Sequence, residues 1–173
     1  MINYNRFKEK KMARKKSNKK TNKNAFLLSG VLLLVALVLW FVLPAVSRTP
    51  LIGDDISYTF LQSTFGYKEV NTEIQVFNFN IAGLLGLIFL VLALVVSVYH
   101  FVAKKSVLGG LAHFVVLVLG VAAGVLVLLS KTTLQIELVT IDPNKVHLAI
   151  GSYIVGPLAI VGGVIPFAFK LIK

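Results

Sequence analysis

The chain contains no cysteine and few charged residues, and both shortages restrict what it can be. Without cysteine there is no disulfide, no thiolate nucleophile and no cysteine-ligated zinc or iron–sulfur site. Only 14% of the 173 residues are charged, whereas a soluble domain has about 25%. P-loop, Gly-x-Ser-x-Gly and His-Glu-x-x-His motifs are missing from the sequence. We therefore expect no catalytic site, no cofactor and no metal site, and the protein is not expected to be an enzyme.

Hydrophobic residues are abundant instead, and they are gathered in long runs. They make up 57% of the chain, and the mean hydropathy is +0.84. A hydrocarbon core about 30 Å thick is crossed by roughly 20 apolar residues in a helix. Four stretches without Asp, Glu, Lys or Arg reach this length, and we predict helices at 25–43, 78–102, 107–130 and 147–169. The expected fold is an all-α transmembrane four-helix bundle over residues 25–173, after a disordered basic tail at 1–24.

The ends of these segments carry recognisable signals. Asn24 can cap the first helix and Pro44 can stop it, while Asn78 or Asn80 can open the second. The first span also has a competing interpretation, because a basic region, an apolar block and a small-residue site at 45–47 together make up a cleavable signal peptide. The apolar block has about 19 residues, more than the ~7–15 of a signal peptide. This length favours an uncleaved anchor.

Basic residues are distributed unevenly between the two sides of the expected bundle. Residues 1–24, the link between the second and third helices, and the C-terminus together hold 14 of the 18 Lys and Arg residues. The positive-inside rule then places both termini in the cytoplasm of a multi-pass plasma-membrane protein. A wealth of Lys, Asn, Ile and Phe suggests a bacterial source. Met12 is an alternative start to Met1.

The basic tail at 1–24 has two interpretations. It can dock on anionic lipid headgroups or contact nucleic acid weakly, or it can be only a disordered segment that sets the topology. We favour the second interpretation and expect no specific nucleic-acid partner.

The two expected outer loops, 44–77 and 131–146, are rich in β-forming residues. Their alternation predicts three strands, at 56–61, 70–77 and 132–141, with a turn at 65–68. A two-stranded hairpin alone is marginal in water, so we expect the three strands to form one small antiparallel sheet. This sheet would bury four side chains: Tyr58, Phe60, Ile74 and Val76.

The layout of four helices, an outer hairpin and a strand in the second outer loop resembles the claudin-type tetraspan plan. The outer-loop signature of that family combines a Trp and a Gly-Leu-Trp run with two cysteines. Here Trp40 is the sole tryptophan, it lies inside a predicted helix near the outer interface, and cysteine is absent. The resemblance therefore implies an arrangement of elements and no function.

The expected spans hold no carboxylate, lysine or arginine, but they do contain histidines. His100 and His113 lie on consecutive antiparallel helices, so they can approach each other near the cytoplasmic interface. A proton-linked or metal-binding role is conceivable because histidine titrates near neutrality. We favour the alternative, in which lipid headgroups, water or backbone groups satisfy both rings.

Small residues at a spacing of four suggest close helix packing. Gly120 and Gly124 form such a pair in the third helix, and the fourth helix carries Gly156 and Gly163 within similar pairs. We expect these glycines to pack the bundle internally. The alternative is that the glycine- and proline-rich fourth helix lines a pore or binds a partner.

These observations favour a structural or accessory membrane protein. It would bind a membrane-protein partner or a second copy of itself through its helix faces or its outer β-rich cap. The alternative is a small transporter or channel subunit that acts as an oligomer. A solute path needs polar lining, and the polar residues of the spans are few: Ser29, Ser97, His100, His113, Ser152 and Tyr153.

Overall fold

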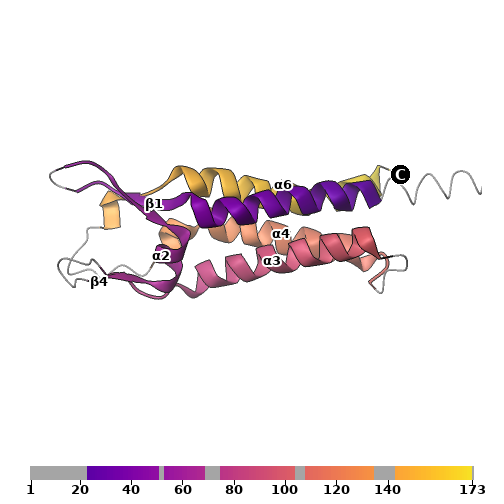
Figure 1. Cartoon of the computed structure of the whole chain (residues 1–173), viewed down its shortest axis with the longest axis horizontal. Coiled ribbons are helices and arrows are strands. Elements are labelled where there is room, and N and C mark those ends of the chain that lie inside the picture. Colours follow the sequence, from indigo (N-terminus) through magenta and orange to yellow (C-terminus); the bar gives the residue numbers. More distant parts are fainter. Residues whose placement is uncertain (1–22, 51–52, 69–74, 104–107, 135–142, 173) are drawn as a thin grey trace, which may run out of the picture.

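The computed structural model describes residues 23–50, 53–68, 75–103, 108–134 and 143–172. Four long helices run side by side in this part of the chain, and the strands gather at one end of them (Figure 1). We call that end the sheet end, and the opposite end, where Lys23 and Leu171 lie, the terminal end. All four are long and apolar enough to cross a membrane: the N-terminal helix (Lys23–Val42), α3 (Ile81–Val102), α4 (Leu111–Leu128) and α6 (Ile150–Leu171).

The four predicted helices are confirmed, with shifts at their starts. Asn80 caps α3, and its side-chain oxygen accepts hydrogen bonds from the backbone N–H groups of Ala82 and Gly83 at 3.0 and 3.3 Å. Asn24 lies inside the N-terminal helix, so its predicted capping role is wrong. Helix α6 begins three residues later than predicted because a strand occupies the preceding positions.

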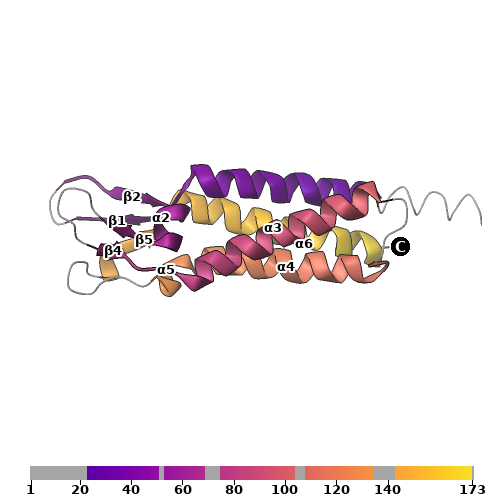
Figure 2. The ribbon, with the colours of Figure 1, turned by 60° about the horizontal axis from the view of Figure 1, so that its bottom comes forward.

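The main sheet of the described chain has three antiparallel strands in the order β2-β1-β5. Strand β1 (Pro44–Arg48) continues directly from the N-terminal helix and lies between β2 (Ile56–Thr59) and β5 (Val146–Leu148) (Figure 2). Val46 of β1 is the register partner of both Tyr58 and Leu148. The sequence interpretation missed β1, which it treated as loop. Its proline stands at the first position of the strand, where the missing N–H is tolerated.

The predicted hairpin between 56–61 and 70–77 is wrong in its pairing. Strand β2 pairs with β1, while β4 (Gln75–Phe77) pairs with the short β3 (Tyr67–Lys68). Helix α2 (Phe60–Phe65) replaces the end of the first predicted strand. A capping box starts this helix, since Thr59 and Gln62 bond each other's backbone N–H groups. The capping box therefore ends the strand alternation at Thr59.

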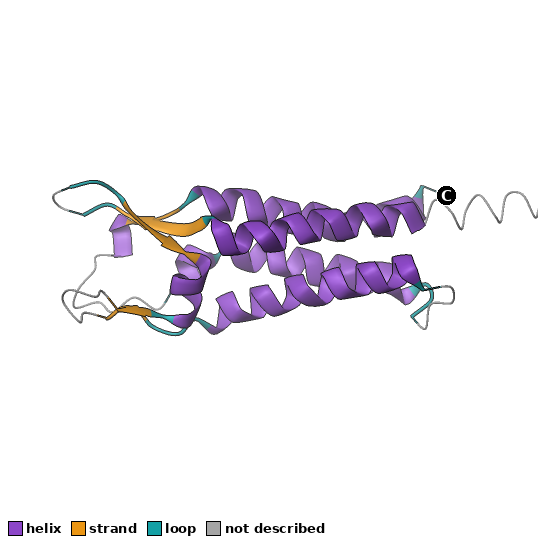
Figure 3. Ribbon diagram, viewed as in Figure 1, coloured by secondary structure: helices purple, strands orange, loops and turns teal. Residues whose placement is uncertain are grey.

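The third predicted strand, 132–141, is not formed at its start. Residues Ser130–Thr133 make the short helix α5, and residues 135–142 lie outside the described chain. The strand that the second loop contributes to the sheet is β5, which follows a 3-10 turn at Pro143–Lys145. The strands thus lie at the sheet end together with the short helices, and the four long helices make up the rest of the described chain (Figure 3).

An aromatic cluster joins the sheet end to the bundle. Tyr58, Phe60 and Val76 are buried as predicted, whereas Ile74 lies outside the described residues. Trp40 is also buried and stacks on Phe60, with ring centroids 5.4 Å apart. The indole therefore packs against α2 inside the protein. Its expected place near the outer interface stays a prediction.

Candidate functional site

Helices α4 and α6 meet along a seam of four glycines. A Cβ atom on Gly120 would lie 2.6 Å from the Cα of Gly163, and one on Gly124 would lie 2.5 Å from the carbonyl oxygen of Gly156. Real Cβ atoms do not approach backbone this closely, so the two backbones are in direct contact. The structure brings all four glycines that the sequence singled out into one interface within the same molecule.

Buried serines tie the helices together by hydrogen bonds. Ser29 of the N-terminal helix donates to the carbonyl oxygen of Gly162 at 2.6 Å, and its Oγ lies 3.1 Å from that of Ser97. At the sheet end, Ser152 donates to the carbonyl oxygen of Ala45 at 2.8 Å and lies 3.3 Å from Ser130. These side chains bond to protein groups, so they are not arranged as the lining of a solute path.

The two histidines singled out in the sequence lie side by side at the terminal end. Their ring centroids are 5.8 Å apart, and Phe26 packs on both, at 4.1 Å from His100 and 4.8 Å from His113. His113 is only 5% exposed, and within the described parts of the chain neither of its ring nitrogens forms a hydrogen bond of normal geometry, although the Gly110 backbone lies close to the ring. The two rings thus approach each other as expected, and His113 is buried among protein side chains.

The surroundings of the histidine pair do not suit a metal ion. Structural and catalytic zinc sites use three or four protein ligands, and no group of three potential ligands occurs among the residues described here. Lys23 lies near enough to His100, and Lys170 near enough to His113, for their positive charges to act on the imidazoles. These charges would repel a bound cation.

A groove of about 350 Å³ runs between the N-terminal helix and α3. Its lining is entirely apolar and consists of Phe26, Leu27, Gly30, Val31, Leu34, Leu94, Val98, Phe101 and Val102. Gly30 has no side chain, and this makes the surface concave at its position. The sequence interpretation did not find this groove, because it depends on which faces of two helices meet.

A polar junction links α2, α3 and α5 at the sheet end. The backbone N–H of Asn80 donates to the carbonyl oxygen of Thr64 at 2.8 Å, and its side chain donates to Thr133 at 3.3 Å. A Cβ on Gly83 would lie 2.6 Å from the hydroxyl of Thr64. Gly83 and Thr64 are therefore in contact, and the hydrogen bonds of Asn80 hold α2, α3 and α5 together.

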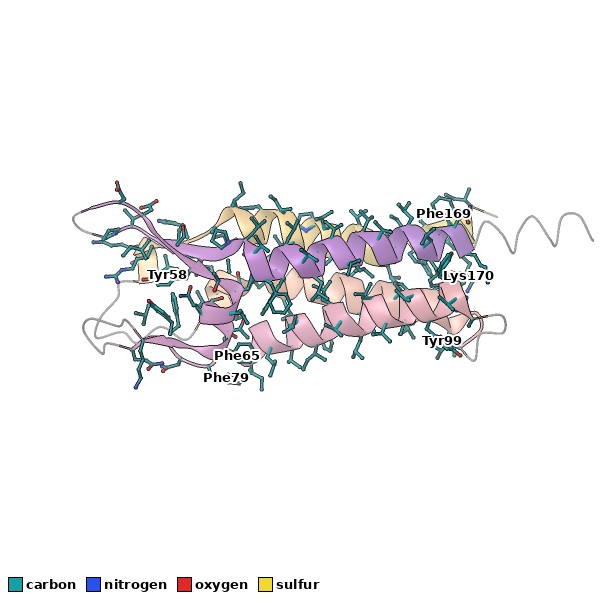
Figure 4. All side chains as sticks on the ribbon, viewed as in Figure 1. Tyr58, Phe65, Phe79, Tyr99, Phe169 and Lys170 are labelled. Atoms are coloured by element: carbon teal, nitrogen blue, oxygen red, sulfur yellow. The ribbon has the colours of Figure 1, made fainter. Side chains whose placement is uncertain are left out.

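Exposed aromatic side chains mark both ends of the bundle (Figure 4). Phe65 and Phe79 lie 6.4 Å apart at the sheet end, and Tyr99 and Phe169 lie at the terminal end near Lys170. Between these two levels the outward side chains of the helices are aliphatic and aromatic hydrocarbons. The surface therefore consists of an apolar belt around the helices, with exposed aromatic side chains at each end of it.

Comparison with protein-family models, curated proteins and solved structures finds no match. The function must therefore be inferred from the geometry of the chain itself.

Proposed function

We propose that the protein is a four-span integral membrane protein with a structural or accessory role, which binds other membrane components. The observation that carries this proposal is the apolar belt around the bundle. In the N-terminal helix the exposed side chains include Leu27, Leu28, Val31, Leu34, Val35 and Val38. An apolar surface of this extent is unfavourable in water but suits lipid, while the glycines and serines face inward.

The dimensions of the helices support insertion into a bilayer. Helix α3 has 22 residues, which at 1.5 Å per residue gives about 33 Å, close to the ~30 Å hydrocarbon core. Tyr99 and Tyr153 stand at opposite ends of the bundle and are 42% and 60% exposed. Tyrosine favours both membrane interfaces, so the two residues support a position of the belt within the core.

The charge distribution supports a cytoplasmic position for the terminal end. In the sequence, 14 of the 18 Lys and Arg residues belong to segments on that side of the bundle. The other four, Arg48, Lys68, Lys131 and Lys145, lie on the sheet side together with Asp54 and Asp55. The membrane that we propose is a bacterial plasma membrane, on the Lys-, Asn-, Ile- and Phe-rich composition. The sheet also favours an uncleaved N-terminal helix. Strand β1 contains the small-residue site at 45–47 and pairs with both neighbours, so cleavage there would remove most of the central strand.

The closed interior favours an accessory role over transport. The glycine seam leaves no space between α4 and α6, and the buried serines bond to one another and to carbonyl groups. A channel built from several copies would have to be lined by the outer helix faces, and these are apolar. The cap formed by the two sheets and α2 is therefore, with the helix faces, the surface that we assign to partner binding.

Affinity purification of the full chain from its native membranes, followed by mass spectrometry, tests the role. We expect a reproducible membrane-protein partner. Loss of that partner in Leu61→Asn, which alters a 41% exposed position of α2, would place its binding site on the cap. Loss in Leu28→Trp would place it on the helix face. A homogeneous homo-oligomer that conducts ions in liposomes would overturn the accessory role.

A further inference from the structure

We infer that the apolar groove between the N-terminal helix and α3 holds one acyl chain of an anionic phospholipid from the cytoplasmic leaflet. This inference rests on the proposed membrane insertion and orientation. It adds a specific lipid partner, which the proposed function does not name. Three features carry it: the size and depth of the groove, its shape, and the charge at its end.

The groove has the volume of one acyl chain and the depth of one leaflet. A methylene group displaces about as much volume as a water molecule, ~30 Å³, so the 350 Å³ groove accommodates about a dozen methylenes. Eleven residues separate Lys23 from Leu34, the wall residue farthest along the N-terminal helix, which corresponds to about 16 Å. This distance is half of a ~30 Å core. The occupant therefore comes from the leaflet at the terminal end.

The shape of the groove distinguishes it from the rest of the lipid-facing surface. Gly30 forms part of the wall, and a Cβ there would still lie 3.7 Å from Val98, so the two helices do not meet tightly at this level. Phe26 and Phe101 line the part nearest the terminal end. A chain in this groove is contacted from two sides. It buries more apolar surface than a chain lying on a convex helix face, at about 0.8 kcal/mol for each methylene buried.

The charge at the end of the groove selects the headgroup. Lys23 precedes the wall residue Phe26 by one turn and lies near His100, which is on α3. Lys170 lies at the same end, and no carboxylate of the described chain does. A phosphate-bearing headgroup with net negative charge is complementary to this end, whereas a zwitterionic headgroup gains less from it.

Native mass spectrometry of the full-length protein provides the test. The protein, purified in mild detergent, is incubated with an equimolar mixture of phosphatidylglycerol and phosphatidylcholine that carry the same acyl chains. We expect one retained phosphatidylglycerol. Val98→Phe fills the groove and should lower lipid retention at least fivefold. Val95→Phe is the matched control, since Val95 is a similarly exposed valine on α3 outside the groove, and it should retain lipid normally.

The headgroup is tested separately from the acyl chain. Lys23→Gln should reduce the preference for phosphatidylglycerol about fivefold, the equivalent of the ~1 kcal/mol that one lysine contributes near anionic lipid. Lys145→Gln, at the sheet end, should leave the preference unchanged. If Val98→Phe does not fold, Leu34→Phe fills the groove from the opposite wall.

The outcomes separate this inference from the proposed function. Equal retention by wild type and by the groove-filling variant, or a preference unaltered by Lys23→Gln, would overturn the lipid site while leaving the membrane protein intact. If the protein fractionates without membranes when cells are lysed, the proposed function itself is wrong and the lipid site is wrong with it. Selective loss in Val98→Phe and Lys23→Gln, with both controls unaffected, establishes the site.

Discussion

Replacing Gly120 by alanine tests whether the α4–α6 seam determines the stability of the bundle. The new methyl carbon would lie 2.6 Å from the Cα of Gly163 and 2.9 Å from the carbonyl oxygen of Ala159. Both obstacles are backbone atoms, which cannot rotate away as a side chain can. Ordinary contacts of a Cβ atom begin at 3.4 Å. The helices must therefore move apart by close to an ångström at this level, and the seam loses contacts along its length.

The magnitude follows from two opposing effects. Overpacking of a tightly packed interior usually destabilises by about 1–3 kcal/mol. Alanine is a better helix former than glycine by ~1 kcal/mol, which opposes this loss. We therefore expect Gly120→Ala to lower the free energy of unfolding by a net ~0–2 kcal/mol, so its better helix propensity brings no gain in stability.

Gly30→Ala supplies the matched control for this experiment. Its new methyl group would lie 3.7 Å from Val98 and 3.8 Å from Ser97, at ordinary contact distance, so propensity alone should raise stability slightly. Thermal unfolding of both variants in the same detergent, followed by circular dichroism, gives the comparison. Equal stability of the two variants would refute the view that backbone contact at the seam holds α4 against α6.

Three further outcomes are expected. The chain has no cysteine, so single cysteines can be introduced to test the topology. Asp54→Cys should react with a membrane-impermeant maleimide on intact cells, whereas Ile172→Cys should react only after lysis. The reverse pattern would invert the proposed topology. Ser29→Ala should lower the unfolding free energy by about 0.6–1.7 kcal/mol, as for hydrogen bonds between membrane helices, whereas the exposed Ser57→Ala should change it little. His113→Leu should raise stability by ~1 kcal/mol because neither buried ring nitrogen forms a hydrogen bond of normal geometry, although the Gly110 backbone lies close to the ring. A clear loss in the same unfolding assay would indicate that Gly110 is a hydrogen-bond partner of the ring.

The helices could be predicted from the sequence because hydropathy is a local property. A run of some 20 apolar residues has few alternatives to a helix of membrane length, whatever the rest of the chain does. Strand pairing depends on residues far apart in sequence, and there the prediction failed. Strand β1 has five residues, begins with a proline and follows a helix directly, so only its partners β2 and β5 identify it.

The small-residue motif illustrates the same limit within the bundle. Gly120 and Gly86 both occur at a spacing of four from another small residue, and the pattern does not distinguish them. In the structure a Cβ on Gly86 would lie 3.4 Å from Leu126, at ordinary contact distance, whereas one on Gly120 would collide with backbone. Which glycine permits contact between backbones depends on which helices are neighbours, and the sequence pattern does not contain that information.

The sheet-end cap is fixed to the bundle at several independent points, and this bears on how it can act. Trp40 stacks on Phe60 of α2, and Ser152 donates a hydrogen bond to the carbonyl oxygen of Ala45 in β1. The backbone N–H of Asn80 donates to Thr64. A lid that opens and closes needs an element with few such contacts. A surface that binds a partner benefits from the opposite, because a pre-ordered surface loses less conformational entropy on binding. The way in which the cap is anchored therefore favours a binding platform over a moving gate.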